Sequence, residues 1–323
     1  MRTVARRMLL RAAALGVAAG GCTSVFTQSG VSPVPASPSP GPISLRLSAR
    51  IRLHMFQTGW VAVKQEHRSF SSPGTLRLPA IIASAMWTEW LPITAYVIEH
   101  PEGLNVVDTG ETAQISNPNY AACDPIAGLF YRKNLKFLVE PKDEIGPQMA
   151  RAGMSADRVR NVVMTHLHSD HMCGMGFFPK ARFWISAGAV AGHSGALMCR
   201  IPAELNIKPV HQTERAIGVF AQSMPLTKDG TLSLVPTPGH ANGHQSVLIQ
   251  DQGTSLCLVG DAAFTVGQIQ DGTVAGIVEN HRAALDSAML LKLQMKHFQT
   301  VMLPTHDPGN VARLADLKLR LAL

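Results

Sequence analysis

The stretch Thr165-His166-Leu167-His168-Ser169-Asp170-His171 places three histidines and one aspartate within six residues. It follows the apolar run Val162-Val163-Met164, which is typical of a strand that ends in a tight loop. In such a loop the three imidazoles and the carboxylate can converge. These donors suit Zn²⁺ and are also acceptable to Fe, Mn or Co. The stretch therefore predicts a metal-binding loop, since an ordinary solvated loop rarely concentrates four possible ligands in this way.

Further metal-binding residue types follow other strand-like runs. The runs at 232–235, 256–259 and 301–303 lead, in that order, to His240, Asp261 and His306. A single histidine in a Pro-Gly-His turn is more often structural than functional. Four strand ends that each carry a donor instead indicate that these side chains gather at one edge of a β-structure.

The full order, His-x-His-x-Asp-His followed by His, Asp and His, resembles the metallo-β-lactamase superfamily across the folded part of the chain. That resemblance implies an α/β fold, a four-layer αβ/βα sandwich of two similar halves with a dinuclear metal site at one edge. Two predicted hairpins agree with two halves, because the hairpin at 94–107 ends in Asp108 and the hairpin at 245–259 ends in Asp261.

The resemblance also implies a ligand set for two divalent metal ions, with zinc preferred. One ion would be held by His166, His168 and His240, the other by Asp170, His171 and His306, and both by Asp261. We expect Asp108 to accept a hydrogen bond from a metal-bound imidazole, although Asp-Thr-Gly is also an ordinary turn. We expect His244 to support the site, since the ligand set is complete without it.

Residues 237–246, Thr-Pro-Gly-His-Ala-Asn-Gly-His-Gln-Ser, resemble the N-acyl homoserine lactonase branch of this superfamily, as do 144–148, 260–262 and 304–308. This branch implies quorum-quenching hydrolysis of a lactone or ester carbonyl. A metal-bridging hydroxide would be the nucleophile, and Asp170 would also accept a proton. The sequence has no Gly-x-Ser-x-Gly elbow that would provide a serine nucleophile instead.

One position departs from the lactonase pattern. Those enzymes commonly carry a substrate-contacting tyrosine three residues after the bridging aspartate, and here that residue is Phe264. Tyr120 or Tyr131 could supply a hydroxyl from the segment 111–140, which we expect to be irregular. Met172 and Met175 are expected to form an apolar pocket wall with Phe264, which would suit a small-molecule substrate with an acyl or aromatic group.

Three other functions stay open at this point. The same site could hydrolyse phosphoesters or aryl esters, or the fold could carry iron and act as an oxidoreductase of the sulfur dioxygenase kind. An exported, non-catalytic lipoprotein with a structural metal is the third, but structural sites usually close at four ligands on one ion.

The N-terminus predicts export from a bacterial cell. Residues 1–22 resemble a twin-arginine signal peptide, with Arg6-Arg7 before a short Ala-rich stretch and small residues before Cys22. Lipidation of Cys22 would tether the protein to a membrane. Ala19 stands where lipoproteins usually have Leu, so an ordinary signal-peptidase cut is the alternative. Either route makes the protein periplasmic or membrane-anchored. A Pro/Ser-rich linker, 23–43, then leads to a folded domain, 44–323.

Composition limits the partners. The 323 residues are 46% hydrophobic and 16% charged, which is typical of a globular protein. The net charge of +7 includes the four arginines of the signal segment, and without them it is +3 (7 − 4). No basic run with interleaved aromatics follows, so nucleic-acid binding is not expected. The sequence leaves open whether any disulfide forms among the remaining four cysteines, Cys123, Cys173, Cys199 and Cys257.

Overall fold

The computed structural model describes residues 41–70, 76–192, 195–213 and 215–322. The predicted signal peptide, 1–22, and all but the last three residues of the predicted linker, 23–43, lie outside the described residues. Within the described ranges, no helix combines the length and the apolar character that crossing a membrane requires.

The first sheet has eight strands in the order β1-β2-β3-β4-β6-β7-β8, with β5 paired to β2. The twelve-residue strand β2 is its longest member and is almost entirely buried, because it pairs with β1, β3 and β5. The strands are β1 (Ile43–Arg46), β2 (Arg52–Val63), β3 (Leu91–His100), β4 (Gly103–Val107), β5 (Leu135–Leu138), β6 (Val159–Val163), β7 (Arg182–Ser186) and β8 (Asn206–Val210).

The second sheet has five strands in the order β13-β12-β11-β10-β9. These strands are β9 (Met224–Pro225), β10 (Leu232–Pro236), β11 (Gln245–Asp251), β12 (Thr254–Gly260) and β13 (Val301–Pro304). The predicted strands after residue 230 are therefore confirmed, and so is the predicted hairpin of β11 and β12.

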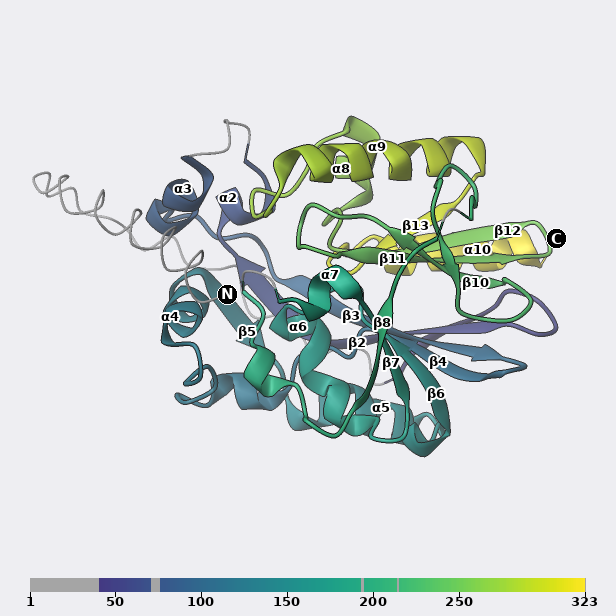
Figure 1. Cartoon of the computed structure of the whole chain (residues 1–323), viewed down its shortest axis with the longest axis horizontal. Helices are drawn as coiled ribbons and strands as arrows, with labels where there is room; N and C mark the ends of the chain where they lie inside the picture. The colour runs from purple at the N-terminus through teal and green to yellow at the C-terminus, as the bar shows by residue number, and fades with distance from the viewer. Residues whose placement is uncertain (1–40, 71–75, 193–194, 214, 323) are drawn as a thin grey trace, which may run out of the picture.

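Three apolar clusters define the layers. One cluster lies between the two sheets and joins side chains of both, for example Leu53 and Leu258. A second covers the other face of the first sheet and includes Met149 of the helix α5 (Ile145–Arg151). A third covers the other face of the second sheet and includes Leu291 of the helix α9 (His281–His297). The order helices, sheet, sheet, helices is the expected four-layer sandwich, with α9 and α5 on its two outer sides (Figure 1).

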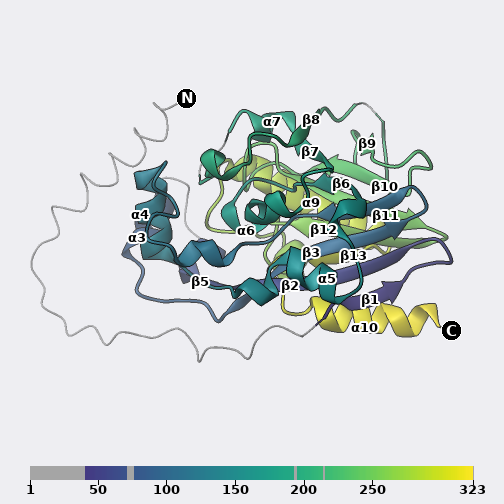
Figure 2. The same cartoon turned by 90° about the horizontal axis from the view of Figure 1, so that it is seen from below.

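The α-helices are α2 (Gln65–Arg68), α3 (Arg77–Ala83), α4 (Pro125–Asn134), α5 (Ile145–Arg151), α6 (Ser169–Met172), α7 (Ala187–Val190), α8 (Val266–Asp271), α9 (His281–His297) and α10 (Asn310–Leu321). Short 3₁₀ turns are η2 (Ala113–Ser116), η3 (Pro141–Asp143), η4 (Ala156–Arg158), η5 (Cys173–Phe177) and η6 (Met198–Arg200). The last helix, α10, lies beside β1 (Figure 2).

The expectation that 111–140 is irregular is wrong, because α4 and β5 lie in this segment. Asp124 caps α4 by accepting hydrogen bonds from the backbone N–H groups of Ile126 and Ala127, and Pro125 occupies the first helical position. Both features favour a helix start. The helix is short and only weakly amphipathic, so the periodicity of its apolar residues does not reveal it.

The two halves share one arrangement that places the site. In the first half, β3 and β4 form an antiparallel hairpin and β4 then pairs in parallel with β6. In the second half, β11 and β12 form a hairpin and β12 pairs in parallel with β13. Because the carboxyl ends of parallel neighbours lie at the same edge, the residues after β4 and β6 meet, as do those after β12 and β13.

Candidate metal centre

Three imidazoles from the two halves converge on one point. The Nε2 atom of His166 lies 2.9 Å from Nδ1 of His168, and Nε2 of His240 lies 3.0 Å from the same atom. His166 and His168 belong to the loop after β6, whereas His240 belongs to the turn after β10. The three form a group whose donor atoms all lie within 4.8 Å of one another.

A second group forms beside the first. Asp170, His171 and His306 bring their donor atoms within 4.8 Å of one another, and His306 Nε2 lies 3.4 Å from Asp170 Oδ2. Asp261 lies between the groups: one carboxylate oxygen is 3.4 Å from His171 Nε2, and the other is 3.6 Å from His240 Nε2 and 3.3 Å from His306 Nε2. The structure thus brings all seven predicted ligands together.

The donors fit a pair of divalent ions. Two atoms bound at about 2.0–2.1 Å to one tetrahedral zinc lie roughly 3.3 Å apart, close to the separations found here. His171 Nε2 and Asp261 Oδ1 are both buried without a hydrogen-bond partner. An unpartnered buried polar atom is costly, so these two atoms call for a positively charged ligand.

Fixed acceptors orient three of the imidazoles. The Nδ1 atom of His171 lies 2.8 Å from Asp108 Oδ2, that of His306 lies 2.8 Å from the backbone oxygen of Pro92, and that of His240 lies 3.1 Å from the backbone oxygen of Ile277. Each ring donates its Nδ1–H outward, so the Nε2 lone pair faces the centre. This is the usual way in which proteins set the tautomer of a metal-bound histidine.

The backbone around these ligands is tightly constrained. Asp108 adopts a positive φ of 56° at the end of β4, and its carboxylate accepts hydrogen bonds from both the N–H and the hydroxyl of Thr165. His244 accepts a hydrogen bond from the backbone N–H of Asp261 at 3.0 Å. Gly260 has φ +64°, and a Cβ there would lie 2.7 Å from His244 Nε2 and 2.8 Å from Thr165 Cβ. The close approach of β12 to the metal loop therefore requires glycine.

Burial and charge determine the protonation of the cluster. Burial lowers the pKa of His166 and of His240 well below the ordinary value, so both imidazoles are neutral and can act as ligands. Burial acts in the same direction on His306, but the Asp261 and Asp170 carboxylates outweigh it and raise the pKa to about 10. The pKa of His171 is raised well above its ordinary value in the same way. The acidic side chains thus stabilise positive charge at the second group, which a cation can supply.

Of the three apolar residues predicted to line the substrate pocket, Phe264 lies next to the metal ligands, whereas Met172 and Met175 lie in the core. Phe264 lies at the centre, with its ring centroid 5.1 Å from that of His306 and 6.1 Å from that of His240. Met172 and Met175 are each 1% exposed and belong to the core on the first sheet, so their side chains stabilise the fold rather than stand free around the metal groups. They lie on the short α6–η5 turn, which packs against that sheet.

The two tyrosines that could have offered a hydroxyl to the substrate, Tyr120 and Tyr131, instead form hydrogen bonds within the protein. Tyr120 donates to Glu111 and lies 2.9 Å from Cys173 Sγ, while Tyr131 donates to the backbone oxygen of Gly195. Tyr131 also accepts a hydrogen bond from the backbone N–H of Ser169, next to the metal loop.

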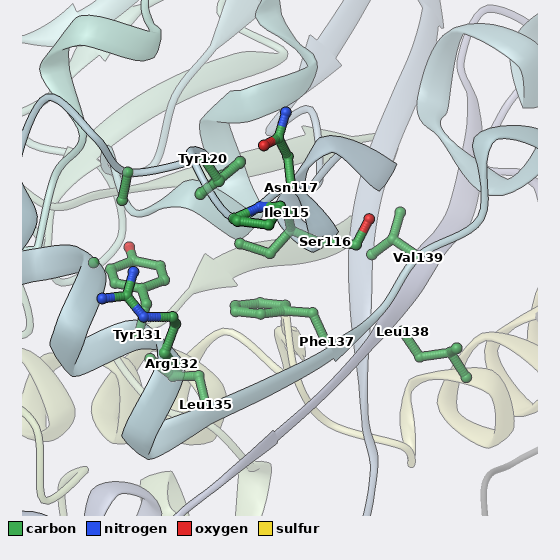
Figure 3. A pocket seen from close by; sticks show the side chains of 13 residues that line it. Ile115, Ser116, Asn117, Tyr120, Tyr131, Arg132, Leu135, Phe137, Leu138 and Val139 are labelled. Atoms are coloured by element: carbon green, nitrogen blue, oxygen red, sulfur yellow. The ribbon is translucent and has the colours of Figure 1, made fainter.

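A cavity of about 290 Å³ is lined mainly by residues of η2, α4 and β5. The stacked rings of Tyr131 and Phe137, with centroids 6.3 Å apart, line one part of it, and Tyr120 and Ile115 line another (Figure 3). None of the seven ligand candidates lines this cavity. Its connection to the site runs through Tyr131, whose ring lines the cavity and whose hydroxyl contacts Ser169.

A disulfide joins Cys123 to Cys199, which are 76 residues apart. It links the segment before α4 to η6, and Arg200 of η6 stacks over the ring of Tyr120 at 4.6 Å. Cys173 and Cys257 are free thiols. The disulfide thus ties the segment before α4 to η6, whose Arg200 contacts Tyr120.

Two residues near the centre, Glu111 and His67, are not among the residues predicted from the sequence. Glu111 is fully buried and accepts hydrogen bonds from Tyr120 and from the N–H of Thr112. Its position directly after Asp108-Thr109-Gly110, at the end of a predicted strand, could have indicated it. His67 on α2 is 7% exposed and packs 6.1 Å from Phe264. Nothing in the local sequence marks His67, because its place depends on the packing of α2 against the second half.

Comparison with known proteins agrees with this geometry. A family model described as the metallo-β-lactamase superfamily matches residues 88–295. The N-acyl homoserine lactonase AttM of Rhizobium radiobacter is 26% identical over 226 residues, which cover 68% of this chain and 82% of AttM. The N-acyl homoserine lactonase AiiA of Bacillus thuringiensis subsp. kurstaki is 29% identical over 228 residues, covering 67% of this chain and 82% of AiiA.

A solved structure shares the fold. An N-acyl homoserine lactone hydrolase, with the product N-hexanoyl-L-homoserine at its catalytic metal centre, superimposes with a TM-score of 0.64 at 22% identity, covering 80% of this chain and 93% of that chain. The matched family model spans most of both sheets and includes six of the seven converging donors. The chain therefore belongs to the metallo-β-lactamase superfamily and is one of its metal-dependent hydrolases.

Proposed function

We propose that this protein is a dinuclear hydrolase that opens lactones or esters, with N-acyl homoserine lactones as the reference substrate class. The observation that carries the proposal is the position of Asp261, whose two carboxylate oxygens face donor groups from both clusters. The similarity to two N-acyl homoserine lactonases and the Thr-Pro-Gly-His segment at 237–240 support the substrate class.

The ligand assignment follows the two groups. His166, His168 and His240 would hold one ion, Asp170, His171 and His306 the other, and Asp261 both. Five imidazoles and two carboxylates favour zinc among the common divalent metals. When bound, the ions supply a water nucleophile activated at neutral pH and a Lewis acid for the carbonyl oxygen.

The side chains of the protein orient the reaction. The outward hydrogen bonds of His171, His240 and His306 fix their rings, so the donor atoms need no rearrangement when substrate enters. Burial acts to raise the pKa of Asp170, but the His171 and His306 imidazoles outweigh it and hold that pKa below its ordinary value. Asp170 is thus ionised at neutral pH and can accept a proton.

Asp170 is better placed for this role than Asp261. The side chain of Asp170 is 13% exposed, against 4% for Asp261, so Asp170 is the carboxylate that an incoming substrate meets. The ring of Phe264 packs beside His240 and His306, but it is 3% exposed and belongs to a buried apolar cluster, so it gives the acyl group little accessible surface. It has no hydroxyl for the carbonyl oxygen, so polar recognition of substrate must come from another residue.

A substrate panel tests the proposal. Zinc-loaded protein is assayed with an N-acyl homoserine lactone, a simple γ-lactone, an aryl ester and a phosphotriester, with His168→Ala as the matched control. We expect the lactones and the ester to be opened by the wild type and the rate to fall by at least 100-fold in the variant. Faster phosphotriester turnover would establish the phosphoester alternative. Bound iron with oxygen consumption would establish the oxidoreductase alternative.

We also propose that the protein works outside the bacterial cytoplasm. The twin-arginine segment at residues 1–22 supports export, and the Cys123–Cys199 disulfide suits an oxidising compartment. Intact-mass analysis of the membrane and periplasmic fractions tests this. A lipid adduct on a chain that starts at Cys22 is expected for a lipoprotein, an unmodified shorter chain for a periplasmic protein, and an uncleaved cytoplasmic chain contradicts export.

A further inference from the structure

The buried side chain of His67 lies beside the metal centre but is not one of its candidate ligands. His67 lies on α2, is 7% exposed, and its Nδ1 atom is buried without a hydrogen-bond partner. Its ring packs between two phenylalanines, with centroids 6.4 Å from Phe130 and 6.1 Å from Phe264. An unsatisfied imidazole nitrogen in apolar surroundings costs stability, so its retention calls for a partner outside the protein.

His67 lies beside the metal centre without joining it. Its ring packs on Phe264, whose own ring centroid lies 6.1 Å from that of His240 and 5.1 Å from that of His306. Its donor atoms nevertheless belong to none of the groups that lie within 4.8 Å of one another among the described residues. His67 is therefore a neighbour of the centre and not an eighth ligand.

Two residues, Ile277 and Gln268, connect the helix that carries His67 to the metal centre by hydrogen bonds. Ile277 donates its N–H to the backbone oxygen of His67 at 3.0 Å and accepts from Nδ1 of the candidate ligand His240 at 3.1 Å. Gln268 donates to the backbone oxygen of Arg68 at 2.9 Å and accepts from the N–H of Phe264 at 2.7 Å. The residues that fix His240 and Phe264 thus also fix α2.

The packing around α2 is equally tight. A Cβ at Gly276 would overlap the backbone oxygen of Glu66, one residue before His67. The backbone of the second half, at Gly276, is therefore in close contact with the helical turn that carries His67. A side chain that is positioned this closely, and left with a free nitrogen, is preorganised for a ligand.

The charge state of His67 limits what it can bind. Burial lowers its pKa to about 4, so the ring is neutral at pH 7 and offers one N–H donor and one acceptor. Bound cations would lower it further, because like charges disfavour protonation. A neutral imidazole between two aromatic rings suits an uncharged polar group with apolar neighbours, and it does not favour a carboxylate or a phosphate.

We propose that His67 is a specificity-determining residue that hydrogen-bonds an uncharged amide of the substrate, beside the reacting carbonyl and next to Phe264. This rests on the proposed function and narrows it to acylamino lactones or esters. The amide satisfies the free Nδ1 atom, while the acyl chain packs on Phe130, which is only partly buried beside His67. The polar contact that Phe264 cannot make then comes from the first half of the molecule.

Paired substrates and matched variants test this. Zinc-loaded wild type, His67→Phe and His67→Gln are compared on N-hexanoyl homoserine lactone and on a γ-lactone with an alkyl chain of similar length and no amide. We expect the ratio of the two kcat/KM values, amide-bearing over amide-free, to fall about tenfold in His67→Phe, as for loss of one hydrogen bond. His67→Gln should recover most of the ratio, with the metal content equal in all three.

Thermal stability is a second measurement, and it separates a loss of substrate recognition from a loss of folding. His54 is also buried, but its ring bonds to both Ser44 and Glu99 at 2.8 Å, so His54→Phe is the matched control. We expect the Tm of His67→Phe to equal or exceed that of the wild type, because no protein hydrogen bond is lost. His54→Phe should melt earlier with an unchanged substrate ratio.

The outcomes are distinguishable. An unchanged ratio in His67→Phe, or a Tm that falls as far as that of His54→Phe, overturns the role of His67 and leaves the proposed hydrolase intact. A metal-loaded wild type that opens neither lactone overturns the proposed function and the role of His67 with it.

Discussion

The Nδ1 atom of His171 lies 2.8 Å from Oδ2 of Asp108, although the two residues are 63 positions apart in the chain. Asp108 is 2% exposed and also binds the N–H and the hydroxyl of Thr165. One carboxylate at the end of β4 thus fixes both the start of the metal loop and the ring of one of its ligands.

This relationship predicts the effect of Asp108→Asn. The amide keeps the shape of the side chain but cannot accept all three hydrogen bonds, so His171 loses its fixed orientation. We expect zinc affinity to fall by about 10–100-fold, measured by competition with a chromophoric chelator. Asp143→Asn is the control, because Asp143 is buried but lies outside every donor group. Equal zinc affinity in both variants would contradict a supporting role for Asp108.

Glu111 predicts a pH dependence of stability. Burial, partly opposed by hydrogen bonds from Thr112 and Tyr120, raises its pKa from 4.5 to about 7. A group whose pKa is higher in the folded state stabilises the fold below the unfolded pKa and loses that contribution as pH rises to the folded pKa. The contribution of Glu111 to stability is therefore lost between pH 4.5 and pH 7.

The isosteric variant Glu111→Gln isolates this effect, because it is neutral at every pH. We expect its Tm to match that of the wild type near pH 4.5 and to exceed it increasingly up to pH 7, after which the gap stays constant. The measurement uses protein stripped of metal by a chelator, since bound cations would themselves lower the pKa. A gap that does not change with pH contradicts the raised pKa.

The Cys123–Cys199 disulfide closes a loop of 76 residues, so it should stabilise the fold by about 2–4 kcal/mol. We expect the urea midpoint of the wild type to fall on addition of a phosphine reductant, whereas that of a Cys123→Ser, Cys199→Ser double variant should not respond. Thiol titration of the denatured, unreduced chain from residue 41 onward should find only Cys173 and Cys257. Four titratable thiols would show that the bond is absent.

The sequence predicts the ligands well because each has a strong local signal. A β-branched or apolar run precedes every donor segment, and parallel pairing of β4 with β6 and of β12 with β13 then brings the ends together. Such runs are recognisable without knowledge of their partners, so they mark the strand ends that carry the ligand candidates. The four-layer fold and the division of the ligands between two ions are instead implied by the resemblance of the donor order to the metallo-β-lactamase superfamily.

The positions of the other residues around the site depend on contacts between segments that are distant in sequence. Met172 and Met175 lie next to the ligands in the chain, but their side chains point into the core of the first sheet. His67 is 173 residues from His240 (240 − 67), and the two are related through the backbone of Ile277 and the ring of Phe264. No periodicity or motif encodes such a placement, because it arises when the two halves pack together.

The number of divalent ions per chain tests the central claim most directly. Elemental analysis of purified wild-type protein should find two ions, zinc foremost, and His168→Ala should lose metal and turnover together. Full turnover by a wild type without divalent metal, or a His168→Ala variant that keeps both ions and full activity, would contradict the dinuclear centre.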